Sequence, residues 1–382
     1  MDVTQSDRAE LNNQLKAVRT RLGLSQQELA RAAGIARQTI GGVEAGIYAL
    51  SLSVALRISK ALGCPIDELF WLNEEAPTVT AVAAKGADWQ CDGTRVSLTR
   101  IADSWIAHPL SGEAAFRTEM TPADGIAMNS PNGANVHVSL ADDADRLGRS
   151  VAVAGCTPAL SLWARSAERW HPGLRVNWFH ANSSSAIECL KRGEVHAAGM
   201  HYSDSHATNR NLQAVRQAFP GEKVVLVNLG IWEEGLVVAS GNPKSIKSVA
   251  DLGSTDITIS NREKGSGCRR LLDEIMVEAG MKPGDIAGYD HEDRSHYDVA
   301  RTVQSGKADA AVSVAAVANA FGLEFLPIRE VSYDLAVPKR YLDHEPVKQL
   351  LSTLDHRWVR TQLAALGGYD TSRMGEVTGE TV

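Results

Sequence analysis

Residues 25–44 read SQQELARAAGIARQTIGGVE, and their pattern predicts two short helices joined by a tight turn. Ser25 is followed three residues later by Glu28, which is the spacing of a capping box at a helix start. Gly34 can adopt the left-handed backbone conformation that ends the first helix. The second helix begins at Arg37 and carries apolar residues at helical spacing, so both helices are expected to share one small core.

The first turn of the second helix carries side chains that suit base recognition, namely Arg37, Gln38 and Thr39. Glutamine can bond adenine through two hydrogen bonds, and arginine can read guanine or hold a phosphate. Two short helices about a glycine turn, the second opening with such residues, favour a DNA-binding helix-turn-helix. The alternative is that these side chains only form a solvated helix face.

Neighbouring apolar patterns extend this motif into a five-helix unit over residues 11–72. Ser51 is expected to begin the fourth helix. Pro65 lies in the first turn of the fifth helix, PIDELFWL, where a proline is tolerated. The first helix is predicted from four apolar residues, namely Leu11, Leu15, Val18 and Leu22.

Two stretches, RLGLSQQELARAAGIARQTIGGVEAG and LSLSVALRISKALGCPIDELF, resemble the Xre/Cro-type phage-repressor DNA-binding domain. The resemblance covers about 60 residues of the chain. It implies that Arg37, Gln38 and Thr39 contact bases in double-stranded operator DNA, and that Gln26 contacts a phosphate. It also implies a homodimer or tetramer, because one recognition helix reads too few bases.

Two departures from that family predict modest DNA affinity. Gly41 and Gly42 lie inside the recognition helix, where each costs up to about 1 kcal/mol relative to alanine. Ile47 stands where relatives often carry a basic residue. The chain has a net charge of -7, yet residues 11–60 carry seven Lys and Arg against two Glu. A local basic face is therefore available for phosphate contacts.

The length of 382 residues predicts two or three domains. No apolar run approaches the roughly 20 residues that span a bilayer, and the polar start MDVTQSDRAELNNQ is unlike a signal peptide. The five cysteines are scattered without a C-x-x-C pair, which argues against a disulfide framework or a zinc finger. These features favour a cytoplasmic protein without membrane contact.

The predicted domains are 1–75 for the helix-turn-helix, 76–147 for a small β-rich connector, 148–368 for an α/β domain and 369–382 for a loose polar tail. The connector is predicted from RVSLTRIADSWIAHPL and ANVHVSLA, which have strand character. The third segment alternates strands and helices, the pattern of a mostly parallel sheet. Within it, VVLVNLGIWEEGLVVASGNP is interpreted as a pair of strands. The fold class is thus α followed by α/β.

The α/β segment resembles the periplasmic-binding-protein-like domains attached to helix-turn-helix regulators, which are related to molybdate and other oxyanion receptors. The stretches that carry the resemblance are GCTPAL, LVVASGNPKSIKSVADL, SNREKGSGCRRLLDE, SHYDVARTVQSGKADAAV, FGLEFLPIREVSYDLAVP and LAALGGYD. The resemblance implies two lobes joined by crossing strands near residues 234–239 and 326–335. It places a ligand in the cleft between the lobes, where loops meet helix N-termini.

Three loops between strands and helices are expected to face this cleft. Each offers backbone N–H groups at a helix start together with hydroxyl or amide groups, a combination that suits an oxyanion or carboxylate. Arginines in the third loop would add bidentate contacts. The alternative is that these residues only cap helices. The candidate ligand-binding residues are Cys156, Thr157, Asn182, Ser183, Ser184, Asn261, Arg262, Ser266, Gly267, Cys268 and Arg269, and the resemblance adds His201 and His296.

Cys156 and Cys268 lie at two of these helix starts, one in each expected lobe. A helix N-terminus lowers the pKa of a thiol, so a thiol switch or a soft ligand across the cleft is one hypothesis. The alternative is a small residue in a tight turn. The spacing of His196, His201 and His206 does not indicate a metal site, and none is predicted. We also find no catalytic constellation, so no enzymatic activity and no cofactor are expected.

These patterns predict a one-component transcription regulator that senses a small anion, with molybdate or tungstate favoured by resemblance. A sensor of an organic acid, a sulfur compound or thiol oxidation has the same architecture and stays open. Two further alternatives are a repressor whose second domain only scaffolds oligomers and a phage-type repressor controlled by a partner protein.

Overall fold

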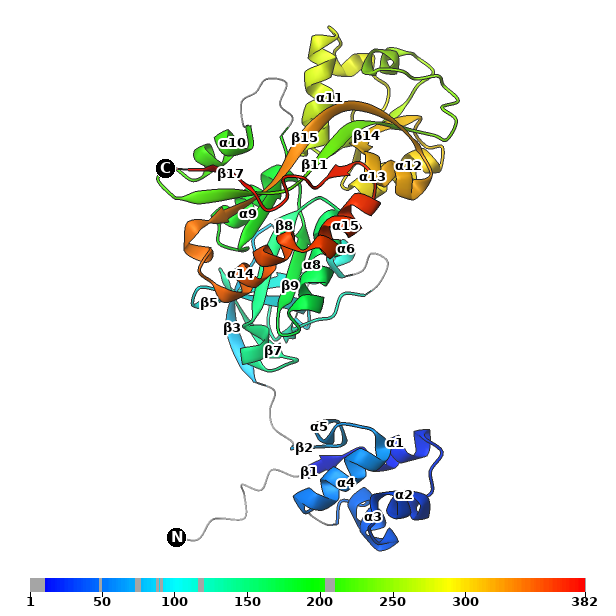
Figure 1. Cartoon of the computed structure of the whole chain (residues 1–382), viewed down its shortest axis with the longest axis vertical. Helices are drawn as coiled ribbons and strands as arrows, with labels where there is room; N and C mark the ends of the chain where they lie inside the picture. Colours follow the sequence, from blue (N-terminus) through cyan, green and yellow to red (C-terminus); the bar gives the residue numbers. More distant parts are fainter. Residues whose placement is uncertain are drawn as a thin grey trace. The chain divides into compact units, whose positions relative to one another are not determined.

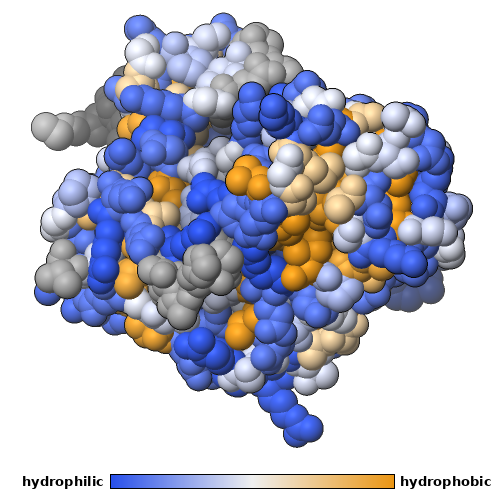
Figure 2. All heavy atoms as spheres, turned by 90° about the horizontal axis from the view of Figure 1, so that it is seen from above, coloured by the Kyte–Doolittle hydropathy of each residue, from blue (hydrophilic) through white to orange (hydrophobic). Residues whose placement is uncertain are grey.

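The computed structural model describes residues 11–47, 50–72, 77–86, 89, 92–115, 120–202 and 210–381. The chain forms two compact units, which are Met1–Pro77 and Thr78–Val382. Figure 1 shows the helices and strands of each unit. Among the described residues, no helix is both long enough and apolar enough to cross a membrane. Hydrophilic side chains cover most of the face shown in Figure 2, with apolar residues gathered in a few patches.

The first unit is the expected five-helix bundle. Its core holds the fully buried side chains of Leu15, Leu29, Ile40 and Ile58, one from each of the first four helices. This is the pattern that amphipathic helices produce when their apolar stripes share one interior. The helices are α1 (Leu15–Arg21), α2 (Gln26–Ala33), α3 (Arg37–Glu44), α4 (Leu52–Leu62) and α5 (Ile66–Leu69).

Both ends of this bundle differ from prediction. The strand β1 (Leu11–Asn13) pairs antiparallel with β2 (Phe70–Leu72), so α1 begins only at Leu15 and α5 ends at Leu69. Leu11 is 42% exposed and Leu22 51% exposed, and neither belongs to the core. The helical spacing of Leu11 was therefore a coincidence, because strand pairing across the unit satisfies its backbone instead.

The second unit begins with a closed five-stranded barrel, which confirms the β-rich connector. Val96, Leu98, Val136 and Val138 fill its interior. Along β7 the buried and exposed residues alternate, as the period of a strand requires. The barrel order is β3 (Thr78–Ala83), β5 (Ser104–Pro109), β4 (Arg95–Ile101), β6 (Gly125–Ala127) and β7 (Asn135–Leu140). The short helices α6 (Gly112–Ala115) and α7 (Ala144–Leu147) flank its strands in sequence.

The barrel is attached to the first lobe of the α/β domain by polar contacts. The buried carboxylate of Asp124 forms an ion pair with Arg175 and accepts a hydrogen bond from the backbone N–H of Leu98 at 2.7 Å. The carboxylate of Glu194 accepts a hydrogen bond from the backbone N–H of Lys85 at 2.9 Å. Barrel and lobe therefore form one body.

A continuous sheet runs through both lobes, in the strand order β13-β12-β14-β11-β15-β10-β8-β9. Its strands are β8 (Ser150–Gly155), β9 (Arg175–His180), β10 (Ala197–Met200), β11 (Val224–Val238), β12 (Ile259–Arg262), β13 (Glu292–Asp293), β14 (Ala310–Val314) and β15 (Glu324–Pro338). The strands β8, β9 and β10 belong to lobe one, and β12, β13 and β14 belong to lobe two.

The long strands β11 and β15 pair antiparallel and link the two lobes, which confirms the expected crossing strands. The interpretation of residues 224–243 as a strand pair was wrong, because β11 is a single strand of 15 residues. A register shift lies between Glu234 and Gly235. A Cβ atom at Gly235 would lie 2.1 Å from the carbonyl oxygen of Leu326, so this approach requires glycine.

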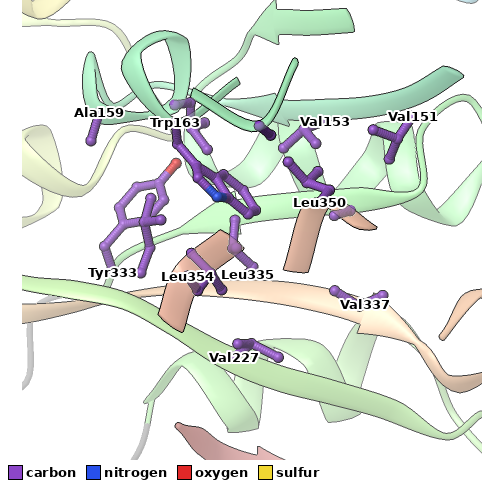
Figure 3. Close-up of a cluster of buried hydrophobic side chains, with 14 of the residues drawn as sticks. Val151, Val153, Ala159, Trp163, Val227, Tyr333, Leu335, Val337, Leu350 and Leu354 are labelled. Carbon is purple, nitrogen blue, oxygen red and sulfur yellow. The ribbon is translucent and has the colours of Figure 1, made fainter. Parts of the chain in front are cut away.

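Helices cover the sheet, and the largest apolar cluster is centred on lobe one and extends into the barrel and lobe two. There Trp163 packs among Val153, Leu335 and Leu350, and its indole N–H donates to the hydroxyl of Thr353 at 2.8 Å (Figure 3). The helices are α8 (Ala159–Trp170), α9 (Ser183–Lys191), α10 (Arg210–Ala218), α11 (Gly267–Glu278), α12 (His296–Gln304), α13 (Ala315–Phe321), α14 (Glu345–Ser352) and α15 (Arg357–Ala365).

The segment 369–382 was predicted to be a loose polar tail, and this is wrong for its described residues. Two strands, β16 (Tyr369–Asp370) and β17 (Val377–Glu380), pair with β11. The buried hydroxyl of Thr381 accepts from the backbone N–H of Val224 at 2.8 Å. The prediction relied on the polar composition of this segment. A strand at the edge of a sheet is held by backbone hydrogen bonds, so it does not need many apolar side chains.

Candidate functional site

The helix α3 presents its predicted recognition residues outward. Arg37 and Gln38 are exposed and Thr39 is half-buried, whereas Ile40 and Val43 face the core. The capping box of α2 is present, since Ser25 Oγ accepts from the backbone N–H of Glu28 at 3.2 Å and Glu28 accepts from Ser25 at 2.8 Å. The short-range signals in the sequence therefore predict the position of α3 correctly.

The side chain of Gln26 is tied to α3. Its amide donates to Glu44 at 2.9 Å, and Glu44 also forms an ion pair with Arg19 at 2.5 Å. The predicted contact of Gln26 with a DNA phosphate stays a prediction. Despite Gly41 and Gly42, α3 is helical throughout.

The two lobes touch where their helices begin. The backbone N–H of Ser184 donates to the carbonyl oxygen of Gly265 at 3.4 Å, and the amide of Asn182 donates to that of Lys264 at 3.5 Å. Asn182 caps α9, as Ser266 caps α11. The loops predicted to line a cleft are thus in direct contact across the lobes.

A buried polar cluster lies behind this contact, and we call it the inter-lobe site. It draws side chains from both lobes and from the crossing strands. Its members are Cys156, Thr157, His201, Trp232, Glu234, Arg262, Cys268, His296 and Tyr333, all of them buried. Six of these nine, His201 among them, were predicted as ligand-binding residues, whereas Trp232, Glu234 and Tyr333 were missed.

The centre of the inter-lobe site is an ion pair between His201 and Glu234. His201 follows β10 in lobe one, and its Nε2 lies 2.7 Å from Glu234 Oε1 on β11. Burial lowers the pKa of His201, but the Glu234 carboxylate and the neighbouring thiols outweigh burial and raise that pKa well above its usual value. Cys268 Sγ donates to the same carboxylate oxygen at 3.3 Å.

Glycine at position 267 allows the lobes to close. A Cβ atom there would lie 2.2 Å from His201 Nε2 and 2.8 Å from the carbonyl oxygen of His201. Any larger residue at Gly267 would push α11 away from lobe one.

Aromatic rings surround the ion pair. Trp232 meets His201 edge-on with ring centroids 4.8 Å apart, and Tyr333 lies 4.9 Å from Trp232. Cβ atoms at Gly155 and Gly199 would lie 2.4 Å and 2.2 Å from the Tyr333 hydroxyl, so both glycines make room for it. In the sequence, Trp232, Glu234 and Tyr333 stand out only because they are polar or aromatic residues inside otherwise apolar strands.

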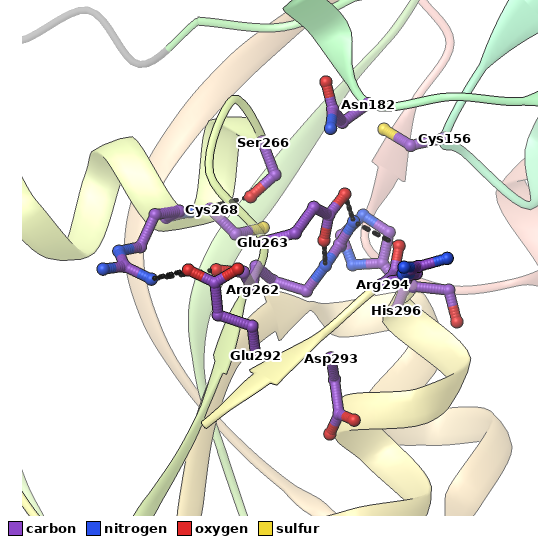
Figure 4. A network of polar contacts seen from close by, with 12 residues as sticks. Cys156, Asn182, Arg262, Glu263, Ser266, Cys268, Glu292, Asp293, Arg294 and His296 are labelled. Atoms are coloured by element: carbon purple, nitrogen blue, oxygen red, sulfur yellow. Dashed lines mark hydrogen bonds and ion pairs between the residues drawn. The ribbon is translucent and has the colours of Figure 1, made fainter. Parts of the chain in front are cut away.

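The predicted anion-binding arginines already have carboxylate partners (Figure 4). Arg262 is buried and binds Glu263 through two hydrogen bonds of 2.9 Å and 3.1 Å. Arg269 contacts Asp273 and Glu292, each at 3.3 Å. Arg269 therefore supports the loop, whereas Arg262 keeps one nitrogen, Nη1, buried and without a hydrogen-bond partner among the described residues.

Two further ring nitrogens in the inter-lobe site lack partners. Among the described residues, neither His296 Nε2 nor Trp232 Nε1 has a hydrogen-bond partner. Burial, followed by the charges of Arg262 and His201, lowers the pKa of His296 well below its usual value, so His296 is neutral. Its Nδ1 lies 2.9 Å from the hydroxyl of Ser313.

The remaining predicted residues hold backbone or loop structure. Ser183 Oγ bonds the backbone of His201 at 3.2 Å, and the Asn261 amide donates to the carbonyl oxygen of Tyr289 at 3.0 Å. Thr157 Oγ1 lies 2.7 Å from the hydroxyl of Tyr369, which belongs to the segment first taken as a tail. Ser184 and Ser266 act at the helix starts described above.

The surroundings of Cys268 do not favour the thiolate form, and the hypothesis of a thiol switch or soft ligand stays a prediction. Burial and then the charge of Glu234 raise the pKa of Cys268 to about 12, which outweighs the helix N-terminus. Cys156 Sγ lies 3.9 Å from Nδ1 of His201, while Cys268 lies toward the Nε2 side. The imidazole ring thus stands between the two thiols, and a disulfide would require it to move.

Comparison with known proteins agrees with both units. The model of a PBP superfamily domain matches residues 164–355, and a helix-turn-helix model matches residues 15–69. An uncharacterized protein of Bacillus subtilis, YvgK, is 31% identical over 256 residues, which cover 66% of this chain and 82% of YvgK. The HTH-type transcriptional regulator YgzD of the same organism is 42% identical over 65 residues, covering 17% of this chain and 98% of YgzD.

Among solved structures, a phosphate-bound substrate-binding protein of a putative phosphate transporter from Clostridium perfringens matches with a TM-score of 0.45 and 15% identity. The match covers 58% of this chain and 98% of that protein. The PBP superfamily model matches half of the chain, residues 164–355, so the chain belongs to the PBP superfamily, and it joins that domain to the helix-turn-helix of a transcription regulator.

Proposed function

We propose that this protein is a one-component regulator in which an anion enclosed at the inter-lobe site controls binding of operator DNA. The observation that carries the proposal is a set of buried nitrogen atoms that have no hydrogen-bond partner among the described residues, namely Arg262 Nη1, His296 Nε2 and Trp232 Nε1. A buried unsatisfied donor costs about 1–3 kcal/mol. A ligand that supplies acceptors would recover that cost only when the lobes are closed.

Helix dipoles at the site favour negative charge. The helices α8, α9, α11 and α12 all begin beside inter-lobe residues, two from each lobe. The N-terminus of each helix carries partial positive charge and unpaired N–H groups. Because Arg262 and His201 are already paired with carboxylates, an anion would be held mainly by neutral donors and these dipoles.

A small oxyanion such as molybdate or tungstate is the favoured ligand, because its oxygens accept hydrogen bonds in several directions at once. An organic acid or an oxidised sulfur compound offers the same acceptor chemistry. The proposal assigns the site to binding rather than catalysis, and it places the protein in the cytoplasm with its DNA.

Along the chain, the barrel lies between the DNA-binding unit and the two lobes that hold the ligand site. It is fixed to lobe one through Asp124 and Arg175 and begins directly after the first unit, at Thr78. Lobe closure would bias the population of DNA-competent arrangements through this connection. On α4, Leu52 is 71% and Leu56 52% exposed. These residues lie one turn apart on one face of the helix, and we propose that they contribute to a homodimer.

The test is calorimetric titration of the EDTA-treated full-length protein with molybdate, tungstate, sulfate, phosphate and succinate. We expect one of these anions to bind. Trp232→Phe should weaken that binding by about tenfold, because it removes the indole N–H together with part of the ring. Trp105→Phe in the barrel is the matched control and should bind normally. If no anion binds and mass spectrometry finds no small molecule in purified protein, the alternative of an oligomerisation scaffold would be favoured.

A further inference from the structure

We propose that His201, Glu234 and Cys268 form a binding site for a divalent transition metal ion of the zinc class. The three side chains come from three parts of the fold: the end of β10 in lobe one, the crossing strand β11 and the start of α11 in lobe two. All three are fully buried. The proposal goes beyond the anion site and stands without it.

The geometry already approximates a coordination sphere. One ligand atom from each residue can be chosen so that all three lie within 4.8 Å of one another. Tetrahedral zinc, with bonds of about 2.0–2.3 Å, holds its ligand atoms roughly 3.3–3.7 Å apart. The contact of 2.7 Å between His201 and Glu234 would open slightly, and the contact of 3.3 Å between Cys268 and Glu234 is nearly at that spacing.

One oxygen of the Glu234 carboxylate is short of hydrogen-bond partners. Among the described residues, Glu234 Oε2 has none, whereas Oε1 lies 2.7 Å from His201 Nε2 and accepts from Cys268 Sγ at 3.3 Å. A buried carboxylate oxygen without a donor is costly. A metal ion bound to this carboxylate would relieve that cost.

Charge balance supports a divalent ion. Binding would replace the imidazolium proton of His201 and the thiol proton of Cys268 with one M²⁺. The bound set would be a neutral imidazole, a carboxylate and a thiolate, whose two negative charges cancel those of the ion. A neutral set is what a fully buried site requires.

The donor types select the metal class. Thiolate and imidazole favour zinc and its neighbours over magnesium or calcium, which prefer oxygen ligands. Three protein ligands leave one tetrahedral position open, as in sites where zinc binds a further molecule. Since the ligands come from both lobes, the ion would hold the lobes closed.

The experiment titrates EDTA-treated full-length protein with Zn²⁺ alone, followed by Co²⁺ as a spectroscopic probe, in buffer without the test anions. We expect one equivalent of Zn²⁺ to bind and Co²⁺ to give a thiolate charge-transfer band in the near ultraviolet. Cys268→Ser should abolish the band. It should also weaken Zn²⁺ binding by at least about 100-fold, because loss of a residue that only supports a metal ligand can already weaken binding by that factor. Cys189→Ser, on the far end of α9, should change neither.

Wild-type protein that binds no Zn²⁺, or binding that Cys268→Ser leaves intact, would overturn the proposal. Should Cys268→Ser lower the melting temperature of the metal-free protein, His201→Gln tests the same site by the same titration. Anion binding is measured on EDTA-treated, metal-free protein, and metal binding is measured without the test anions. The failure of one proposal therefore does not decide the other.

Discussion

The recognition helix α3 and the inter-lobe site differ in where their functional side chains lie. The end of α3 is held by Arg19 and Gln26 on neighbouring helices of a small bundle, and its functional side chains face outward. The inter-lobe site instead joins residues from Cys156 to Tyr333 and buries all of them. A surface that is complete by itself is ready to bind DNA. A site built from two lobes can alternate between an open and a closed state, which is what the proposed sensing requires.

The sharpest test of this contrast removes the charge at the centre of the inter-lobe site. Glu234→Gln leaves the buried His201 without its carboxylate, and breaking a buried pair costs about 3–5 kcal/mol. Removing Glu376 from its exposed pair with Arg373 should cost about 0–1 kcal/mol. Denaturant unfolding of the EDTA-treated protein measures both. Equal costs would show that the buried pair has no special role.

Lobe closure should depend on the single glycine that meets His201. Gly267→Ala places a Cβ atom 2.2 Å from His201 Nε2, and we expect about 1–3 kcal/mol of destabilisation from overpacking. Thermal stabilisation by the anion should also be lost. Gly284→Ala is the control, because its Cβ atom would meet nothing within 4 Å. An unchanged ligand response in Gly267→Ala would contradict the closed geometry.

The pH dependence of stability should include contributions of opposite sign from two buried histidines of the inter-lobe site. The folded-state pKa of His201 is raised, so its stabilisation is fully present below the unfolded pKa, about 6.5, and is lost as pH rises toward the folded pKa. The folded-state pKa of His296 is lowered, so stability falls as pH drops below about 6.5, because the unfolded state takes up the proton.

The unfolding free energy of the metal-free protein should therefore be highest near pH 6 to 7, which are the rough limits set by the unperturbed histidine pKa. His201→Gln should flatten the alkaline side of that profile and leave the acid side. A profile in which His201→Gln alters only the acid side would mean that His201 is neutral in the folded protein.

The smallest expected effect lies in the DNA-binding unit. Gly41→Ala should stabilise α3 by up to about 1 kcal/mol, since the added Cβ atom would lie 3.8 Å from the Gln26 amide. DNA affinity, measured by fluorescence anisotropy, should rise modestly without any change in anion affinity. Gly46→Ala should destabilise instead, because Gly46 has a φ of 71°. A loss of affinity in Gly41→Ala would mean that DNA needs space at this position.

The sequence could predict the first unit because its signals are local. The capping box at Ser25 and the turn at Gly34 each act within a few residues. Prediction failed where distant strands decide, as when β2 takes Leu11 out of a helix and β11 recruits residues after Tyr369. Glu234 was missed for the same reason, because only the fold brings it to His201. The predicted helix starts identified the loops that meet between the lobes. They did not show that the arginines of the third loop already pair with carboxylates.

The central claim is that an anion at the inter-lobe site controls DNA binding, and one measurement tests it most directly. Operator DNA is first selected from random sequence with the full-length protein, and its dissociation constant is then measured with and without a saturating anion that binds by calorimetry. We predict a change of at least about fivefold, the lower range of allosteric coupling, which Trp232→Phe reduces at an anion concentration that just saturates the wild-type protein. An identical dissociation constant with every anion that binds would contradict the account.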